Sequence, residues 1–446
     1  MATTMAPFVK LGSGPPWAIR NNTGGSMKRI SRATLAGLVL ACAGVGHAYA
    51  GKGFFGGMKV NGDIRAYDFT RHYSGPVAGQ QAFSLGGALN VLSGSVGGFG
   101  VGLTFYTAHS LGLNNSNPAL VDGTLAGLDG IDTLGQAFVQ YANRKVLVRA
   151  GDQSITSPWV NPSDSRMIPA TYQGLLAAVK PIKGLTISAM RITRFKSRTS
   201  NHFSQTDLYN STGTFNIGGT GGLTGKTESG LAAVGASYHA AGLKTGVWGY
   251  QFYGLAKMAY AEGSYTLPGA GSVKPFVGAQ VLRETGSGQQ YLGPVDATVY
   301  GAMAGVKYAE SQLSVGYNDL PAHPGAFGNG DVVSPYTTGY ATDPLYTTSM
   351  IQGMVDRKTT GHAVKIAATT FLLQHKLRVI ASFADYFNTV YSGYSSARTN
   401  EADLDLTYFL GGPLKGLSVR DRVGVAHNLP VVHRFVYNRI MVEYDF

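Results

Sequence analysis

The chain has 446 residues, of which 44% are hydrophobic but only 13% are charged, whereas about a quarter of the residues in soluble domains are charged. Its single cysteine, Cys42, excludes an intramolecular disulfide framework and a cysteine-based metal site. Residues 51–446 hold 31 basic and 24 acidic residues, a mild excess, and nucleic-acid binding would need the basic residues clustered in a reading motif. We therefore expect small anions, and no nucleic acid, as partners.

Residues 27–50 have the pattern of a secretory signal peptide: a basic start, a short apolar region and the small-residue end Ala48-Tyr49-Ala50. The apolar region is too short for a transmembrane helix. Cleavage after Ala50 would leave a mature chain of residues 51–446. Residues 1–26 are then expected to be a mis-assigned upstream extension. A lipoprotein cleavage site at residues 39–42 is the alternative, but Leu40 fits that pattern poorly.

Beyond the signal peptide, apolar and polar residues alternate with a period of two, which predicts β-strands. For example, Leu404, Leu406 and Tyr408 alternate with Asp403 and Asp405. A soluble β-sandwich alternates in the same way, so the alternation alone leaves both architectures open. The signal peptide and the aromatic C-terminus favour a membrane barrel, in which the apolar face meets lipid and the polar face lines a lumen.

Turn signals divide the alternating sequence into eighteen segments. Short turns, such as 143–144, alternate along the chain with long loops, such as 108–133, 194–230 and 321–360. Outer-membrane barrels have short periplasmic turns and long extracellular loops. We therefore predict an all-β fold for residues 51–446: a transmembrane antiparallel β-barrel of about 18 strands, in the outer membrane of a Gram-negative cell. The expected strands lie near residues 58–67, 81–92, 98–107, 134–143, 145–153, 173–180, 184–193, 230–239, 243–252, 256–265, 274–284, 298–308, 312–320, 361–369, 376–386, 401–411, 416–427 and 434–446.

The last nine residues, 438–446, are expected to form the closing strand. Ile440, Val442, Tyr444 and Phe446 would face lipid, with the two rings in the periplasmic aromatic girdle. Barrels of about 16 to 18 strands leave an aqueous channel, so we expect a lumen open to water unless loops fold into it. We also expect the barrel-insertion machinery to bind the chain through the strand that ends at Phe446.

Four groups of motifs follow one another in a fixed order along the mature chain. They are Arg65 to Arg71; Gly98 to Val101 with Ser110 to Leu113; Val148 to Gln153 with Asp164 to Gly174; and Asp403 to Leu406, Gly412 to Ser418, Arg420-x-Arg422 and Asn438-Arg439. In this order and spacing they resemble the OprD-type substrate-specific outer-membrane porins. Loops 194–230 and 321–360 show no such resemblance, and Asp421 stands where an apolar, lipid-facing residue would be expected.

The resemblance implies an eighteen-stranded barrel, a monomer or a loose trimer, whose third outer loop folds into the lumen and narrows it. That loop lies near residues 154–172. The implied solutes are small anionic or zwitterionic molecules with a carboxylate, such as amino acids or organic acids, which diffuse passively along a row of arginines. Arg166 lies in the segment that matches the family's pore arginine, so we expect it at the constriction.

Alternation places further arginines on the lumen face of their strands. They are Arg65, Arg149, Arg378, Arg420, Arg422 and Arg439. Arginine suits a carboxylate channel because its guanidinium binds a carboxylate with two hydrogen bonds and stays charged, and charges of one sign raise the local anion concentration. Asp63, Asp403, Asp405 and Glu443 share the inward face and are expected to form an acidic counter-face. For each residue alone, an ordinary solvated wall charge is the alternative.

Two other functions stay open at this stage. A general small-solute or anion pore with low selectivity would show the same strands. An outer-membrane hydrolase would need a nucleophile elbow, and none is visible, so we expect no enzymatic activity. His362, His375, His427 and His433 lack metal-ligand spacing, so we expect neither a metal nor a cofactor.

Overall fold

The computed structural model describes residues 53–209, 230–268, 272–356, 360–389, 397–429 and 432–446. The upstream extension (1–26) and the signal peptide (27–50) lie outside the described residues, so both stay predictions. Part of the loop expected at 194–230 lies outside them too.

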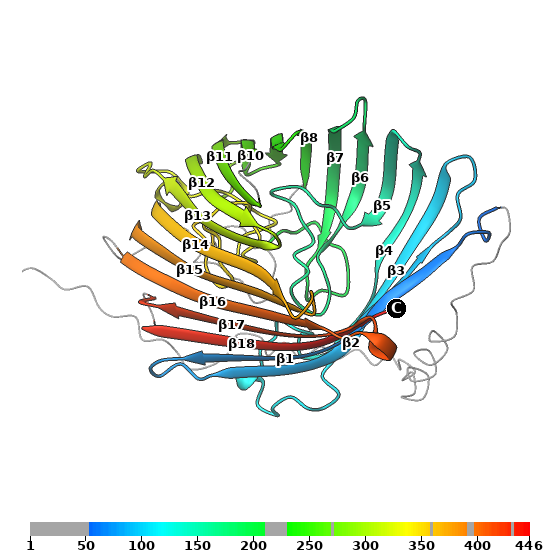
Figure 1. Cartoon of the computed structure of the whole chain (residues 1–446), viewed down its shortest axis with the longest axis horizontal. Coiled ribbons are helices and arrows are strands. Elements are labelled where there is room, and N and C mark those ends of the chain that lie inside the picture. Colours follow the sequence, from blue (N-terminus) through cyan, green and yellow to red (C-terminus); the bar gives the residue numbers. More distant parts are fainter. Residues whose placement is uncertain (1–52, 210–229, 269–271, 357–359, 390–396, 430–431) are drawn as a thin grey trace, which may run out of the picture. The chain divides into compact units, whose positions relative to one another are not determined.

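The described residues form a closed antiparallel β-barrel of eighteen strands (Figure 1). Each strand pairs with the next one in sequence, and β18 pairs with β1 to close the barrel. The predicted all-β fold and strand number are therefore confirmed. In chain order the strands are β1 (Lys59–Tyr73), β2 (Gln80–Leu92), β3 (Phe99–His109), β4 (Ile131–Ala142), β5 (Val146–Gln153), β6 (Thr171–Val179), β7 (Leu185–Lys196), β8 (Leu231–Ala240), β9 (Leu243–Phe252), β10 (Ala256–Thr266), β11 (Val273–Gly286), β12 (Asp296–Tyr308), β13 (Ser311–Leu320), β14 (Gly361–Leu372), β15 (Leu377–Thr389), β16 (Ala397–Phe409), β17 (Leu417–His427) and β18 (Arg434–Asp445).

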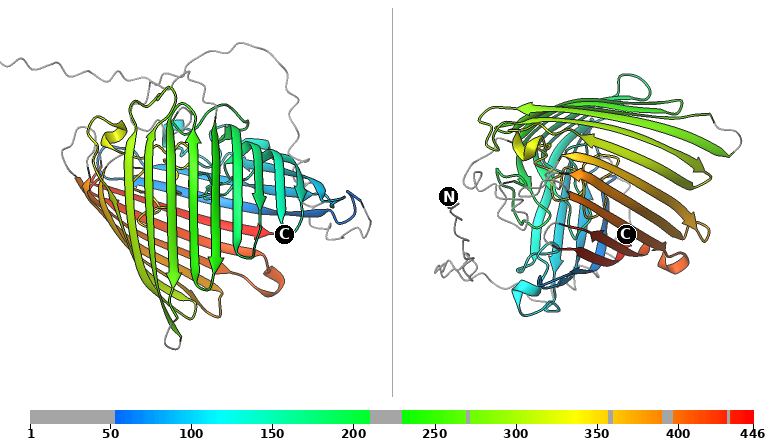
Figure 2. Two further views of the ribbon diagram at one scale, coloured as in Figure 1. Left: turned by 90° about the horizontal axis from the view of Figure 1, so that it is seen from above. Right: turned by 90° about the vertical axis from the view of Figure 1, so that its left-hand side faces the viewer.

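The connections differ in length between the two ends of the barrel (Figure 2). At one end, β4 joins β5 and β8 joins β9 through tight turns, whereas β3–β4, β5–β6 and β13–β14 are joined by long loops at the other end. We take the end with the short turns as the periplasmic side. The described connections also contain short 3-10 turns, namely η1 (Pro118–Leu120), η3 (Phe327–Asn329) and η4 (Gly412–Leu414). Among the described residues, no helix is long and apolar enough to cross a membrane.

The outer face of the barrel exposes large apolar side chains. On β3, Val101, Leu103 and Phe105 are exposed, whereas Thr104 and Tyr106 between and beside them are buried toward the interior. This alternation matches a wall that meets lipid on one side. The outer face of the barrel is therefore suited to contact lipid tails and not water.

The C-terminal residue closes the barrel at its periplasmic end. The backbone N–H of Phe446 donates to the carbonyl of Gly62 (3.0 Å), and the N–H of Gly62 donates to the carbonyl of Phe446 (3.1 Å). Position 62 needs glycine because a Cβ there would lie 2.1 Å from the carbonyl oxygen of Ala88 and 2.9 Å from the Phe446 ring. The rings of Tyr444 and Phe446 stack with centroids 6.3 Å apart.

Strand β1 is longer than its sequence predicted. It was expected to end near residue 67 but continues to Tyr73. Alternation weakens beyond residue 67 because the outward positions hold Asp68, Thr70 and His72 instead of apolar residues. The strand persists because its backbone pairs with β18 and β2 along this whole stretch.

The lumen is partly filled by loops that fold inward. A buried apolar cluster joins loop residues to the inner wall from β6 to β15; Trp159, Tyr209 and Tyr336 from the loops pack with Tyr172 and Phe252 from the strands. The rings of Tyr336 and Phe195, for example, lie 5.4 Å apart, edge to face. The expected open lumen is therefore narrowed, and the space that remains follows the wall formed by β1 and β14 to β18.

Candidate functional site: the pore constriction

Three cavities follow one another along the inner wall: the first two border β1 and β16 to β18, and the third borders β1, β2 and β3. The outer cavity, on the extracellular side, has a volume of about 640 Å³, the central cavity about 170 Å³ and the inner cavity, on the periplasmic side, about 140 Å³. The outer and central cavities share Asp164, Ser165, Arg166, Arg420, Arg422 and Arg439. The central and inner cavities share Arg65 and Asp164. These shared residues mark the two places where the cavities adjoin.

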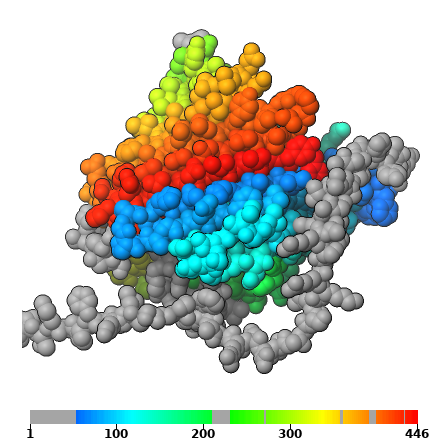
Figure 3. Space-filling model, turned by 90° about the horizontal axis from the view of Figure 1, so that it is seen from below, coloured from blue at the N-terminus to red at the C-terminus, as the bar shows by residue number. Residues whose placement is uncertain are grey.

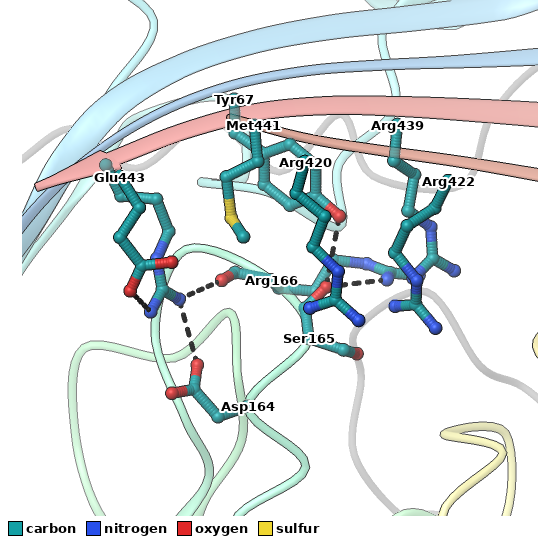
Figure 4. A pocket seen from close by; sticks show the side chains of 10 residues that line it. Tyr67, Asp164, Ser165, Arg166, Arg420, Arg422, Arg439, Met441 and Glu443 are labelled. Atoms are coloured by element: carbon teal, nitrogen blue, oxygen red, sulfur yellow. Dashed lines mark hydrogen bonds and ion pairs between the residues drawn. The ribbon is translucent and has the colours of Figure 1, made fainter. Parts of the chain in front are cut away.

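Arg65, on β1, anchors the loop between β5 and β6; Figure 4 labels its partners Asp164, Arg166 and Glu443. One of its Nη atoms donates to Asp164 Oδ1 (2.9 Å) and to the carbonyl of Arg166 (2.6 Å), and the other donates to Glu443 Oε1 (2.9 Å). Its Nε lies 3.7 Å from Asp63 Oδ2. Three carboxylates surround one guanidinium, and one of them, Asp164, belongs to the loop. Arg65 is therefore an anchor for the loop and not a free cation.

Arg166 lies in that loop and is buried, with 5% of its surface exposed. Its Nε donates to Thr124 Oγ1 (3.3 Å) and its Nη1 to the carbonyl of Ser165 (3.0 Å). No carboxylate of the described chain comes within 4 Å of its guanidinium. Burial, followed by the charges of Arg439 and Arg198, lowers the pKa of Arg166 well below its ordinary range. Because these same effects disfavour an unpaired cation, an anion bound here would be stabilised.

Asp405 pairs with two arginines of the neighbouring strand. Arg420 donates from Nε to Oδ1 (2.9 Å) and from Nη2 to Oδ2 (2.5 Å). Arg422 Nε lies 3.0 Å from Asp405 Oδ2. The register of β16 and β17 places Asp405 directly opposite Arg422. The arginine row therefore already contains one carboxylate that belongs to the chain itself.

The ring of Phe69, on β1, is shared by several guanidinium groups. Arg71 and Arg166 each lie 4.9 Å from its centroid, and Arg439 lies 5.1 Å from it. Arg439 also lies 4.1 Å from the Tyr437 ring. Cation–π attraction of this kind stabilises a guanidinium without neutralising it. The Phe69 ring thus holds Arg166 and Arg439 close together while their charge stays available to a solute, whereas Arg71 is also paired with Asp122.

Arg149 lies apart from this row, whereas Arg378 lies level with Arg420 and is separated from it by Thr407 of β16. Arg149, on β5, donates from Nη2 to Gln140 Oε1 (2.8 Å), and its guanidinium lies 4.0 Å from the Phe138 ring. Arg378, on β15, donates to Thr407 Oγ1 (3.1 Å). Neither residue lines the outer, central or inner cavity. The alternation of inward and outward positions along each strand placed both residues on the inner face, but it could not show how far they lie from the constriction.

Of the four predicted acids, three pair with arginines as described above, and Asp403 differs from them. Asp403 lines the outer cavity, where its Oδ2 accepts hydrogen bonds from Ser382 Oγ (3.1 Å) and from the N–H of Met350 (3.3 Å). The four carboxylates therefore do not gather on one face across from the arginines. Within the described chain, no group of three or more His, Cys, Asp or Glu side chains is placed to hold a metal.

Two cations of the outer cavity were not singled out from the sequence. Arg71 shares the inward face of β1 with Arg65, and its Nε lies 2.6 Å from Asp122 Oδ2. Lys365, on β14, donates from Nζ to the carbonyl of Thr348 (2.5 Å). The alternation of β1 carries the signal for Arg71, provided that the strand is followed beyond residue 67.

Arg198, in the loop after β7, is a third cation near the constriction that the sequence did not reveal. It is buried, and one Nη donates to Ser163 Oγ and Ser165 Oγ at 3.0 Å each. Its guanidinium lies 3.5 Å from the Tyr340 ring. Burial lowers the pKa of Arg198. No sequence signal pointed to Arg198, because a long loop has no periodic pattern that fixes where its side chains lie.

A closed barrel with an apolar outer face, an inward-folded loop and a row of lumen arginines defines an outer-membrane channel for small solutes. The comparison with protein families agrees: residues 52–330 match the family described as outer membrane porin, OprD family. The chain belongs to the OprD family of outer membrane porins. It is therefore a channel of the Gram-negative outer membrane and not an enzyme. No curated protein matches the sequence.

Solved structures of the same fold come from Pseudomonas. A BenF-like porin from Pseudomonas fluorescens Pf-5 is 17% identical, with a TM-score of 0.75 over 88% of this chain and 100% of that chain. OccK2 (OpdF) of Pseudomonas aeruginosa, in complex with glucuronate, is 18% identical, with a TM-score of 0.71 over 90% and 99% of the two chains. OpdK of Pseudomonas aeruginosa, with vanillate, is 16% identical, with a TM-score of 0.71 over 88% and 100%.

Proposed function

We propose that this porin conducts small carboxylate-bearing solutes by passive diffusion, with Arg166 at the constriction and Arg439, Arg422 and Arg420 as the wall row beside it. The observation that carries the proposal is the arrangement of buried guanidinium groups at the junction of the outer and central cavities, where Arg166 and Arg439 have no carboxylate of the described chain within 4 Å. Such groups attract a carboxylate more strongly than solvated surface cations do.

The relatives support the choice of a carboxylate. Glucuronate and vanillate, the molecules present in the OccK2 and OpdK structures, each carry a carboxylate group. In this chain, Arg166 and Arg422 both border the outer cavity, so one solute carboxylate could pass from the first guanidinium to the second. Stepwise transfer of this kind suits a channel, because binding must be strong enough to enter and weak enough to leave.

Two further properties stay proposals. We propose that the barrel is a monomer or a loose trimer. We also propose that outer-membrane insertion depends on the closing strand through Phe446, whose backbone completes the ladder with Gly62.

The test is planar-bilayer recording with the purified channel and a panel of amino acids and aromatic or aliphatic acids. We expect some of these acids to lower the ion current by occupying the constriction, and Arg166→Ala to weaken that block at least about tenfold, since the charge-assisted hydrogen bonds of a guanidinium contribute about 1.5–3 kcal/mol. Arg149→Ala is the matched control, because it removes an inward arginine away from the cavities.

Indifference of the current to every acid would support the general, weakly selective pore instead. Equal loss of block in the Arg166 and Arg149 variants would also contradict the proposed role of Arg166, because it would point to a diffuse charge effect.

A further inference from the structure

The outer face of the barrel carries two arginines near the extracellular end of β7. Met190 and Ile192 are buried toward the interior, which leaves Arg191 between them on the outer face. Thr193 is the extra residue where the pairing of β6 and β7 shifts, and a bulge of this kind turns the side chains that follow it. Arg194 is exposed on the outer face as a result. Both arginines therefore face outward although they are three positions apart.

The strand registers extend this row of cations to β10. Arg191 lies opposite Ala232 on β8, which in turn lies opposite Gln251 on β9. Gln251 lies opposite Lys257 on β10, and Lys257 is exposed between two buried neighbours. Neighbouring strands are about 4.8 Å apart, so the backbones of Arg191 and Lys257, three strands apart, are separated by about 14 Å. We refer to Arg191, Arg194 and Lys257 as the basic belt.

The cations of the basic belt have no close acidic partner. No carboxylate of the described residues lies within 4 Å of their charged groups. Asp152, on the outer face of β5, accepts a hydrogen bond from Gln173 (2.9 Å) and acts on Arg194 only at longer range. Asp296, on β12, pairs with Arg283. The basic belt is thus a positively charged strip of the outer face.

The guanidinium of Arg191 is held in a fixed position. One of its Nη atoms donates to the carbonyls of Ile192 and Leu231, the latter at 3.2 Å. The guanidinium also lies 4.6 Å from the ring of Tyr253. These contacts leave its charge intact, and a guanidinium that is already ordered loses less entropy when it binds an anion. Arg191 is therefore prepared to bind a negatively charged group.

An apolar surface adjoins the basic belt toward the periplasmic side. Val234, two residues from Ala232 on β8, is 57% exposed, and Val247 on β9 is 53% exposed. Val281 on β11 is exposed on the same face. Lipid tails cover such a surface. The basic belt therefore lies where the tails end and the headgroups of the outer leaflet begin.

The other side of the barrel differs in its outward charges. Figure 3 shows that side, where β1 in blue adjoins β18 in red. Its outward acids are satisfied within the chain: Asp68 accepts a hydrogen bond from Gln81 (2.9 Å), and Asp421 accepts one from Asn438 (2.5 Å). The cation Arg434 lies at the first residue of β18. A row of cations without close acids therefore marks the face formed by β7 to β10, and an anionic partner fits that face.

We propose that the basic belt binds the phosphate groups of a glycolipid headgroup in the outer leaflet, which in a Gram-negative outer membrane is lipopolysaccharide. This headgroup carries phosphates at both ends of a disaccharide, so one molecule can contact Arg191 with one end and Lys257 with the other. A free phosphate ion would reach only one end of the basic belt. Guanidinium groups bind phosphate with two parallel hydrogen bonds, and lysine adds a point charge. The binding holds the extracellular rim of the barrel in the leaflet and does not depend on which solute is conducted.

The experiment measures the binding of lipid A to the full channel in detergent by isothermal titration calorimetry. We expect lipid A with two phosphates to bind the wild type at least about tenfold more tightly than dephosphorylated lipid A, since one lost charge-assisted hydrogen bond has an effect of that order. The double variant Arg194→Gln, Lys257→Gln should lose at least about tenfold in affinity for the phosphorylated lipid for the same reason. Arg398→Gln with Lys415→Gln is the matched control, because it removes two exposed cations elsewhere and changes the net charge equally. The control should bind like the wild type.

A second variant keeps the test decisive if the double variant does not fold. Ala232→Glu retains every cation but places a carboxylate opposite Arg191, so it should weaken binding by a similar factor, whereas Ala232→Gln should not. Equal affinity of the wild type for the two lipids would overturn the proposal. So would equal losses in the double variant and its control, or displacement of the lipid by inorganic phosphate at equal concentration, which would indicate a site for a free anion.

Discussion

Asp405 is the residue that sets how much positive charge the arginine row presents. Its carboxylate engages Arg420 through two hydrogen bonds and lies 3.0 Å from Arg422 Nε. A solute carboxylate must therefore compete with Asp405 for these two guanidiniums. Arg166 and Arg439 have no such competitor among the described residues, which makes them the stronger anion sites of the row.

Asp405→Asn should raise anion selectivity. A negative charge about 10 Å from an anion changes the energy of that anion by roughly 0.4 kcal/mol in water, a factor of about two, and by more where water is excluded. Asp405 lines the outer cavity itself, so its removal should have at least this effect. The reversal potential in a salt gradient measures this change. Asp385→Asn, which removes a carboxylate paired with exposed Arg398 away from the cavities, should leave the potential unchanged. An unchanged potential in the Asp405 variant would show that Arg420 and Arg422 do not face the path.

Individual lumen residues were predictable from sequence where their strand alternates cleanly. The alternation along the strands predicted that Arg65, Arg420, Arg422 and Arg439 lie on the inner face, and each of them lines the central cavity. Pairing between side chains was not predictable, because it depends on the register of neighbouring strands. Arg198 was out of reach, since its position follows from how a long loop packs.

Arg65 is the charged anchor of the loop between β5 and β6, in addition to the apolar packing of Trp159 and Ile168. Arg65→Met keeps the length of the side chain but leaves Asp63, Asp164 and Glu443 without their shared cation. We expect the packing of the loop to lose about 3 kcal/mol, the lower end for a broken buried ion pair, because Asp164 is half-exposed. Single-channel recordings should then show large fluctuations between conductance levels.

Arg149→Met is the control for that experiment, because Arg149 bonds only to Gln140 within its own wall. Steady currents in the Arg65 variant, or fluctuations of equal size in both variants, would contradict the anchoring role of Arg65.

The loop between β13 and β14 contains a pair of buried acids. Burial is the main cause that raises the pKa of Asp343, and burial followed by the charge of Asp343 raises the pKa of Asp356 well above its ordinary value. A raised folded-state pKa favours the protonated form in the packed loop. The protonated acids therefore stabilise the packed loop fully below about pH 4, the ordinary aspartate pKa. This stabilisation is lost as pH rises through their raised folded-state pKa.

Acidification should accordingly stabilise the packing of this loop. Its residues Tyr340 and Thr348 line the outer cavity. We expect open-channel current noise to increase as pH rises above about 4, and Asp356→Asn to remove most of that increase. Asp129→Asn, at an exposed position in another loop, should behave like the wild type. Noise that rises equally with pH in the Asp356 variant would assign the effect to other groups.

Strands were far more predictable than loops for a physical reason. A strand in this wall has one face in lipid and one in the interior, so its sequence must alternate. The largest departure at a strand end was in β1, where outward Asp68 and Thr70 hid its continuation. The inward packing of Trp159 and Tyr336 left no periodic signal, because a loop residue can turn in any direction. The loop near residues 154–172 could be expected only through the family resemblance.

At the scale of the whole molecule, β18 closes the barrel by pairing with β1, and Phe446 extends that pairing to Gly62 at the periplasmic end. Phe446→Ala removes the ring that packs against Gly62 and Tyr444, so the assembled fraction in the outer membrane is expected to fall severalfold. Heat-modifiable migration of the folded barrel measures that fraction. Tyr408→Ala, which removes an exposed ring near the periplasmic end of β16, is the control. Equal assembly of both variants with the wild type would show that closure does not need the terminal ring.

The contact between Arg65 and Asp164, where the central cavity meets the inner one, is made of charged groups. Constrictions that stop ions by dewetting are lined with hydrocarbon instead, so this junction keeps its hydration even when it is too narrow for an organic acid. Chloride and potassium ions could then pass through the channel even when an organic acid cannot. Electrical conductance and nutrient uptake would rank variants of this porin in different orders.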